Sequence, residues 1–127
     1  MSRLHTRICD LFGVELPIVQ TGMGWVAGSR LTAATSAAGG LGILAAATMT
    51  LEQLDKQIQD VRAATDKPFG VNLRGDSADI DDRLKLLVTH GVKVASFARA
   101  PGKDSIKRLK DAGIVTMPTV GARRHAE

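Results

Sequence analysis

The segment QTGMGWVAGS, residues 20–29, holds the residue types and spacing in this chain most suited to chemistry. Three glycines surround Met23 and Trp25, the only tryptophan of the chain. Glycines let the backbone approach a ligand closely and expose its N–H groups. Such a segment can cradle a phosphate, form the wall of a site for a planar cofactor, or simply make a tight turn, and the neighbouring elements must decide among these roles.

Gly22, Gly24 and Ala27 match the G-x-G-x-x-G/A spacing of loops that bind dinucleotides, and a strand-like PIVQ precedes them. A nicotinamide site also needs an acidic residue near the end of the next strand, to bind the ribose hydroxyls. The chain has LAAATM there, and Glu52 follows only inside a helical pattern. A Rossmann-like module therefore stays open as an alternative, with one requirement unmet. No G-K-[ST] follows the glycines, which excludes a Walker loop.

The elements around this segment alternate between short apolar runs and amphipathic stretches. The runs predict strands at 17–20, 41–45, 69–73, 92–97 and 114–118. Helices are predicted at about 29–40, 50–65, 79–90 and 103–113; the first is rich in small residues and suited to close packing on the sheet. Thr50 and Gln53 have capping-box spacing, and Gly91 and Gly113 are placed to end their helices.

This alternation, without hairpin signals, predicts an α/β fold with parallel strands. The 127 residues favour an open doubly wound sheet, because a closed barrel of eight units needs roughly 200 residues or more. The beginning of a further helix after residue 118 indicates instead the front part of a longer fold.

Ligands of parallel α/β folds lie beyond the carboxyl ends of the strands, so the residues at those ends are the candidates for binding. These ends hold Gln20 to Gly24 after the first strand, Ala45 to Ala47 after the second, Asn72 and Arg74 at the third, and Met117 to Thr119 at the fifth. Backbone amides, a thioether and a side-chain amide suit the flat face and polar edge of a heterocycle. The strand ends offer no nucleophile and no metal-ligand set. Structural roles remain open, namely a tight turn for the glycines, core filling for Met23, a loop cap for Asn72 and a solvated charge for Arg74.

Bulk composition excludes several classes of protein. A hydrophobic content of 44% with 24% charged residues is globular, and no segment approaches 18 apolar residues, so neither disorder nor membrane spanning is expected. A single cysteine, Cys9, allows no internal disulfide and fits the reducing cytoplasm. The net charge of +4 is concentrated in residues 98–127 without interleaved aromatic residues, so we expect a small-molecule substrate and no nucleic acid.

Three motifs carry a family resemblance: P-I-V-Q-x-G-M at 17–23, A-G-G-L-G at 38–42 and K-P-F-G-V-N at 67–72. At these spacings the sequence closely resembles the amino-terminal part of the nitronate monooxygenase (2-nitropropane dioxygenase) family, which are FMN-dependent TIM barrels. It is also similar to an actinobacterial branch of that family associated with steroid-ring degradation. The resemblance implies an oxidoreductase that oxidises an alkyl nitronate or a related carbon acid, with FMN reduced and then reoxidised by oxygen.

Carried over to this chain, the resemblance places Gly22, Met23 and Gly24 against the flavin ring. It places Asn72 at the polar pyrimidine edge of the ring, with Arg74 lining the cofactor just beyond.

Thr119 stands where some relatives have a lysine, a departure that removes a cation near the ring.

The catalytic histidine of the family lies in a G-G-H-x-G segment after strand six, and its phosphate-binding loops follow strands seven and eight. No such segment occurs before Glu127, so no catalytic residue is assigned, and weak or no retained flavin is expected. Residues 1–127 are predicted to form a single incomplete (β/α)8-type FMN-binding domain, truncated after strand five and containing five strands and four to five helices. A non-catalytic half-barrel that self-associates or pairs with its missing half, and an FMN-dependent enoyl reductase, remain alternatives.

Overall fold

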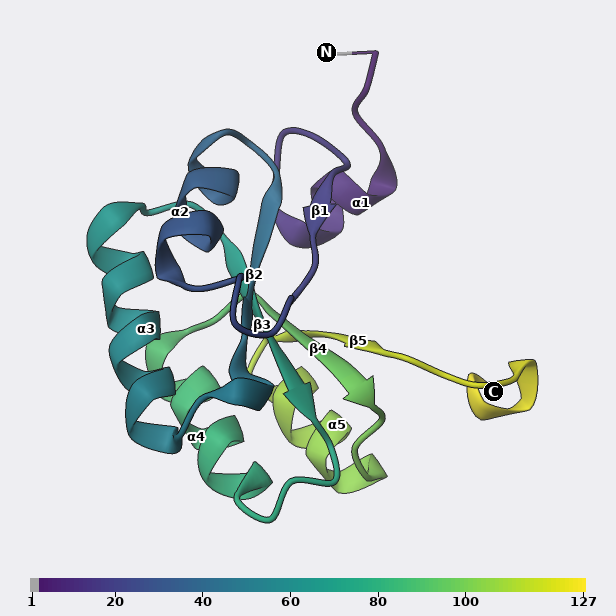
Figure 1. The fold of residues 1–127 in the computed structure, drawn as a ribbon. Helices are drawn as coiled ribbons and strands as arrows, with labels where there is room; N and C mark the ends of the chain where they lie inside the picture. The colour runs from purple at the N-terminus through teal and green to yellow at the C-terminus, as the bar shows by residue number, and fades with distance from the viewer. Residues whose placement is uncertain (1–2) are drawn as a thin grey trace.

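The computed structural model describes residues 3–127, in which strands alternate with helices along a single sheet (Figure 1). The strands are β1 (Val19–Gln20), β2 (Leu41–Ala45), β3 (Phe69–Arg74), β4 (Val94–Arg99) and β5 (Val115–Pro118). The α-helices are α1 (Arg7–Phe12), α2 (Ser29–Ala37), α3 (Leu51–Ala64), α4 (Ile80–His90) and α5 (Lys103–Asp111). Two 3-10 helices, η1 (Ala46–Thr48) and η2 (Arg123–His125), follow β2 and β5.

The sheet is parallel throughout, with strand order β1-β2-β3-β4-β5. A doubly wound sheet reverses its strand order at a switch point, where its nucleotide binds. No reversal occurs among the described strands, so the expectation of an open doubly wound sheet, drawn from length, is wrong. Helices α2 to α5 all lie on one face of the sheet (Figure 1). Successive crossovers in one direction produce a half-barrel, which confirms the predicted parallel β/α repeats.

The outer face of the half-barrel holds the larger core. Phe69, Val71 and Leu73 of β3 alternate onto this face and pack with the buried side chains of α3, α4 and α5. The small-residue helix α2 does pack close to the sheet, as predicted. A Cβ atom added at Gly42 of β2 would collide with the backbone of Thr32 in α2.

The inner face of the half-barrel is organised in rows set by the strand register. One row joins Ile43, Gly70, Val94 and Val115 across β2 to β5. The next row toward the carboxyl ends joins Ala45, Asn72, Ser96 and Met117. Because neighbouring positions in a row point to the same side of the sheet, this second row forms a continuous floor at the carboxyl end of the inner face.

Helix α1 closes the opposite, amino end of the same face and was not predicted from the sequence. Its Cys9 and Phe12 are buried against Leu41 and Ile43 of β2. Gly13 ends the helix with a φ of 71°, a conformation that glycine adopts without strain.

The local signals in the two central helices are confirmed. The Thr50 hydroxyl accepts a hydrogen bond from the Gln53 backbone N–H at 3.1 Å, and the Gln53 side chain accepts one from the Thr50 N–H at 2.9 Å. Gly91 ends α4 in the left-handed region. On the helix surfaces, Lys56 pairs with Asp60 at 2.6 Å and Arg108 pairs with Asp81 at 3.6 Å.

The sequence predicts the beginning of a further helix after β5. The structure has only the short 3-10 helix η2 there, and η2 projects away from the helical layer (Figure 1). None of the helices within residues 3–127 has both the length and the apolar character needed to cross a lipid bilayer.

Candidate functional site

The loop after β1 lies directly over the inner floor of the half-barrel. A Cβ atom at Gly22 would lie 2.6 Å from the Cβ of Asn72 and 3.5 Å from the Cα of Ala45. Real side chains do not approach so closely, so only glycine lets the loop contact the ends of β2 and β3. The sequence separates Gly22 and Asn72 by fifty positions, and the fold brings these two predicted site residues together.

The rest of the loop is a turn tied to β2. The Ala27 N–H donates to the Met23 carbonyl at 2.8 Å, and the Ala45 N–H donates to the Ala27 carbonyl at 3.0 Å. A Cβ at Gly24 would lie 3.1 Å from Cγ2 of Thr48, so this glycine also sits close against η1. Met23 is 40% exposed and leaves its thioether accessible to a ligand. The tight-turn role foreseen for the glycines and a role in binding are therefore compatible.

Asn72 is fixed by a neighbour that the sequence analysis missed. Its Nδ2 donates to the hydroxyl of Ser96 at 2.7 Å, and Ser96 is 5% exposed. Ser96 stands next to Asn72 in the inner floor. The signal that marks it is the alternation within VASF of β4, where every second residue faces inward. The pair presents an oriented amide at the middle of the floor.

Gln20, at the end of β1, is a second residue to which the sequence analysis gave no specific role, and its side chain carries a buried acceptor without a donor. Its Nε2 donates to the carbonyls of Thr21 at 2.6 Å and Ile43 at 3.1 Å. Its Oε1 is buried and has no hydrogen-bond partner. A buried polar atom left unpaired costs about 1–3 kcal/mol, so this oxygen is a group that a donor on a bound ligand would satisfy.

Arg74 lies at the rim rather than on the floor. Its Nε and Nη2 donate to the two carboxylate oxygens of Asp76 at 3.1 and 3.0 Å. This bidentate hydrogen bonding holds the pKa of Asp76 below its ordinary value, and Arg99 approaches the same carboxylate at 3.5 Å. The guanidinium is thus engaged by the acidic loop that follows β3, and its predicted contact with the cofactor stays a prediction.

Thr119 lies past the end of β5, where its backbone N–H donates to the Phe97 carbonyl at 3.0 Å and its side chain is exposed. The structure therefore groups Gly22, Met23, Gly24 and Asn72 at one place, with Arg74 and Thr119 farther out on the rim.

Comparison with known proteins identifies the family of the chain. A family model described as "Nitronate monooxygenase" matches residues 5–85, which include the glycine loop, Asn72 and Arg74. The chain belongs to the nitronate monooxygenase family.

Among curated relatives of this family member, the chain is 60% identical over 124 residues to "(3aS,4S,5R,7aS)-5-hydroxy-7a-methyl-1-oxo-octahydro-1H-indene-4-carboxyl-CoA dehydrogenase" of Mycobacterium tuberculosis (strain ATCC 25618 / H37Rv). The match covers 98% of this chain and 35% of the relative, so the chain spans about a third of that protein's length.

Two solved structures share the fold. FabK from Thermotoga maritima superposes with a TM-score of 0.87 at 39% identity, over 93% of this chain and 38% of FabK. Nitroalkane oxidase from Streptomyces ansochromogenes gives a TM-score of 0.81 at 30% identity, over 95% of this chain and 44% of that one. The predicted fold, the amino-terminal part of a TIM barrel, is confirmed, and the family is one of oxidoreductases.

Proposed function

We propose that this chain supplies the wall and floor of the flavin-ring site in an FMN-dependent oxidoreductase of the nitronate monooxygenase type. The observation that carries the proposal is the close approach of Gly22 to Asn72, which joins the glycine loop to the floor of the half-barrel. Membership of the family supports it.

The residues present fit a flavin ring. The isoalloxazine system is flat and has a pyrimidine edge with both hydrogen-bond donors and acceptors. The glycine loop provides a surface on which a flat ring can lie, since no Cβ projects from Gly22 or Gly24. Asn72 and the unpaired Oε1 of Gln20 provide polar groups at the level of that surface.

The role proposed for the chain's own residues is to bind and orient the flavin ring. Bound FMN would take electrons from a carbon-acid substrate and pass them to oxygen. Gly22, Met23 and Gly24 set one face of the site, while the hydrogen bond from Asn72 to Ser96 fixes which way the amide points. Arg74 and Thr119 are proposed as outer contacts at the rim.

Substitution of Gly22 tests this assignment. Gly22→Ala places a methyl group into Asn72, and we expect the affinity for FMN, measured by titration of flavin fluorescence, to fall at least ten-fold. Gly121→Ala is the matched control, because a Cβ there meets only His125 at 3.8 Å. Equal affinity of the two variants would count against a ring contact at Gly22.

The substrate class is a finer proposal. The chain is 60% identical to a dehydrogenase named for a hydroxylated, ketone-bearing bicyclic carboxyl-CoA, and this favours a coenzyme A thioester over a simple nitroalkane as the substrate. Anaerobic mixing of the flavin-loaded protein with each candidate distinguishes them by bleaching of the flavin absorbance. Bleaching by an alkyl nitronate alone would favour monooxygenase activity, and bleaching by NADH alone would favour an enoyl reductase.

The two edge strands of the sheet favour a further proposal, that the chain associates with another chain. Within the described residues β1 and β5 each pair on one side only, and Ile18 and Val120 near these edges are 57% and 39% exposed. Unpaired parallel edges with apolar neighbours favour assembly with a second copy or with a complementary half-barrel. Sedimentation velocity should show a species larger than 13.4 kDa, and a stable monomer at high concentration would refute this.

A further inference from the structure

We propose that a cleft on the helix side of the glycine loop binds the adenine ring of an adenine nucleotide, such as the one in coenzyme A. The choice of coenzyme A as the source rests on the proposed function, whereas adenine recognition rests on the cleft itself. The cleft is about 280 Å³ in volume. It is bordered by Trp25 from the loop, Thr48 and Met49 after β2, and Gln53 and Gln57 of α3.

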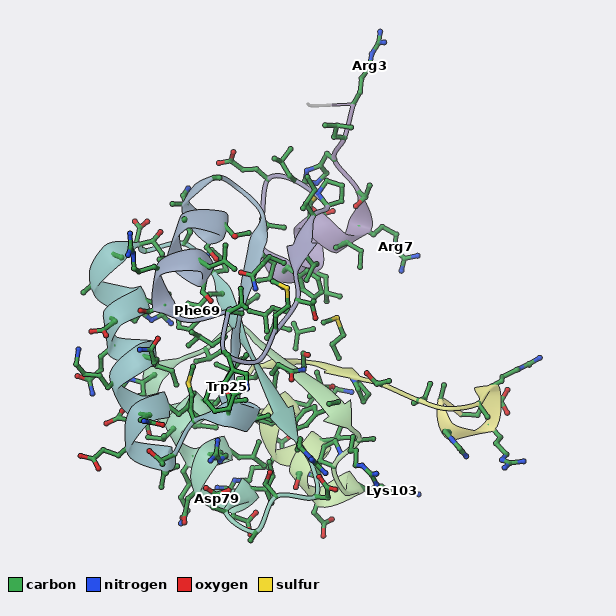
Figure 2. All side chains as sticks on the ribbon, in the orientation of Figure 1. Arg3, Arg7, Trp25, Phe69, Asp79 and Lys103 are labelled. Carbon is green, nitrogen blue, oxygen red and sulfur yellow. The ribbon has the colours of Figure 1, made fainter. Side chains whose placement is uncertain are left out.

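Trp25 supplies a stacking surface. Its side chain is 89% exposed, and its backbone has a φ of 66°, in the left-handed region that large residues rarely occupy. Strained conformations of this kind persist mainly where they serve a function. Trp25 lies beside the turn that follows β2 (Figure 2). Stacking of a base on an aromatic side chain is worth about 1–3 kcal/mol.

The two glutamines supply oriented donors. Gln57 Oε1 accepts from the Ser29 backbone N–H at 2.7 Å, and Gln53 Oε1 accepts from that of Thr50 at 2.9 Å. These bonds fix the amide oxygens, and within residues 3–127 neither NH2 group donates a hydrogen bond, so both are open to a ligand. Residues four apart share one face of a helix, so both amides serve the same cleft. A glutamine NH2 group can donate to a ring nitrogen of adenine such as N7.

The size and charge of the cleft set its ligand. None of its lining side chains is charged, which suits a neutral heterocycle and not a phosphate. Its volume lies just below the roughly 300–1,000 Å³ of pockets that bury a whole drug-sized molecule. One bicyclic base therefore fits, with the remainder of the nucleotide outside. The cleft runs from α3 to Ala45 at the edge of the inner floor, whereas Gly22 of the loop packs on Asn72 within that floor.

Trp25 is the only tryptophan, so intrinsic fluorescence reports directly on stacking. We expect saturable quenching by adenosine, coenzyme A and 3′-dephospho-coenzyme A, and none by pantetheine, which lacks adenine. Quenching by adenosine but not by coenzyme A would keep the adenine site and remove coenzyme A as its source. No saturable quenching by adenosine, or equal quenching by pantetheine, would overturn the proposal.

Two conservative variants separate binding from folding. Gln53→Glu and Gln57→Glu each keep the oxygen that accepts the backbone N–H and remove the NH2 donor, so the fold is retained while adenosine binds at least five-fold more weakly. Gln59→Glu adds the same charge to α3 outside the cleft and should leave adenosine affinity unchanged. Trp25→Leu, followed by calorimetry, should weaken adenosine binding at least ten-fold. Unchanged affinity in these variants would refute the site, and because no flavin or turnover is involved, that result leaves the proposed oxidoreductase function intact.

Discussion

The two ends of the inner face of the half-barrel are built from the same strands and differ in what they leave unsatisfied. At the amino end, Phe12 and Cys9 of α1 pack on Leu41 and Ile43, all within 3% exposure. At the carboxyl end, one row farther along, the floor contains the Asn72 amide beside an unpaired Gln20 oxygen. In barrels of this type stability concentrates at the amino end and ligand binding at the carboxyl end. The difference teaches that the amino end is built by apolar packing, whereas the carboxyl end presents polar groups that a ligand can contact.

Removal of the Phe12 side chain should have the largest effect, and it should fall on stability. Phe12→Ala leaves a cavity against Leu41 and Ile43 and is expected to lower the free energy of unfolding by about 3–5 kcal/mol. Urea denaturation measures this loss. Phe12→Leu keeps most of the volume and should lose less, while the folded fraction of either variant keeps its flavin affinity. If flavin affinity fell by more than the loss of folded protein explains, the amino end would also contribute to binding, and the contrast between a stabilising end and a binding end would be wrong.

Substitution of Gln20 should show the opposite pattern. Gln20→Met removes the unpaired buried oxygen together with two hydrogen bonds, each worth about 0.5–1.5 kcal/mol, so these changes largely offset one another in stability. Flavin affinity should fall about ten-fold, because a ligand donor loses its acceptor. Parallel urea denaturation and flavin titration check both halves. A strongly destabilised variant with normal affinity would make Gln20 a structural residue.

The smallest effect concerns a hydrogen bond between Asp55 and His90 on the helical layer, outside both ends. His90 Nε2 lies 2.6 Å from Asp55 Oδ1, and this hydrogen bond, with a second from Gln59, holds the pKa of Asp55 below its ordinary value of 3.8. A lowered carboxyl pKa stabilises the fold above the unfolded value and the contribution disappears as pH falls through the folded value.

Asp55→Asn should therefore be less stable than the wild type at pH 6, with the difference shrinking below about pH 3.8. Thermal unfolding across this pH range measures it. Flavin affinity at pH 6 should be the same in both proteins, and a change in affinity would connect the helical layer to the site.

Local signals account for what the sequence predicted well. The capping box at Thr50 and the glycine after α4 act over a few residues, and both appear as expected. Helix α1 was not predicted because it has only six residues. Its stability comes from the tertiary packing of Cys9 and Phe12, which hydrophobic periodicity does not reveal.

Within the site, the sequence indicated which residues could bind a ligand, but it did not indicate which of them contact one another. The glycine loop and Asn72 were singled out, yet their contact depends on the pairing of β2 with β3. Ser96 lies in an apolar run and resembles a filler residue until the register places it beside Asn72. Arg74 has a side chain long enough to turn back to Asp76, a choice of partner that spacing does not determine.

The most direct test compares the affinities of the protein for FMN and for riboflavin, which has the same ring and no phosphate. The floor and loop contain no charged side chain, and the Arg74 guanidinium is occupied by Asp76. If these residues contact the ring, fluorescence titration will give dissociation constants for the two ligands within about three-fold, and Gly22→Ala will weaken both equally. FMN binding thirty-fold or more tighter than riboflavin would contradict a ring site at the carboxyl end of the half-barrel.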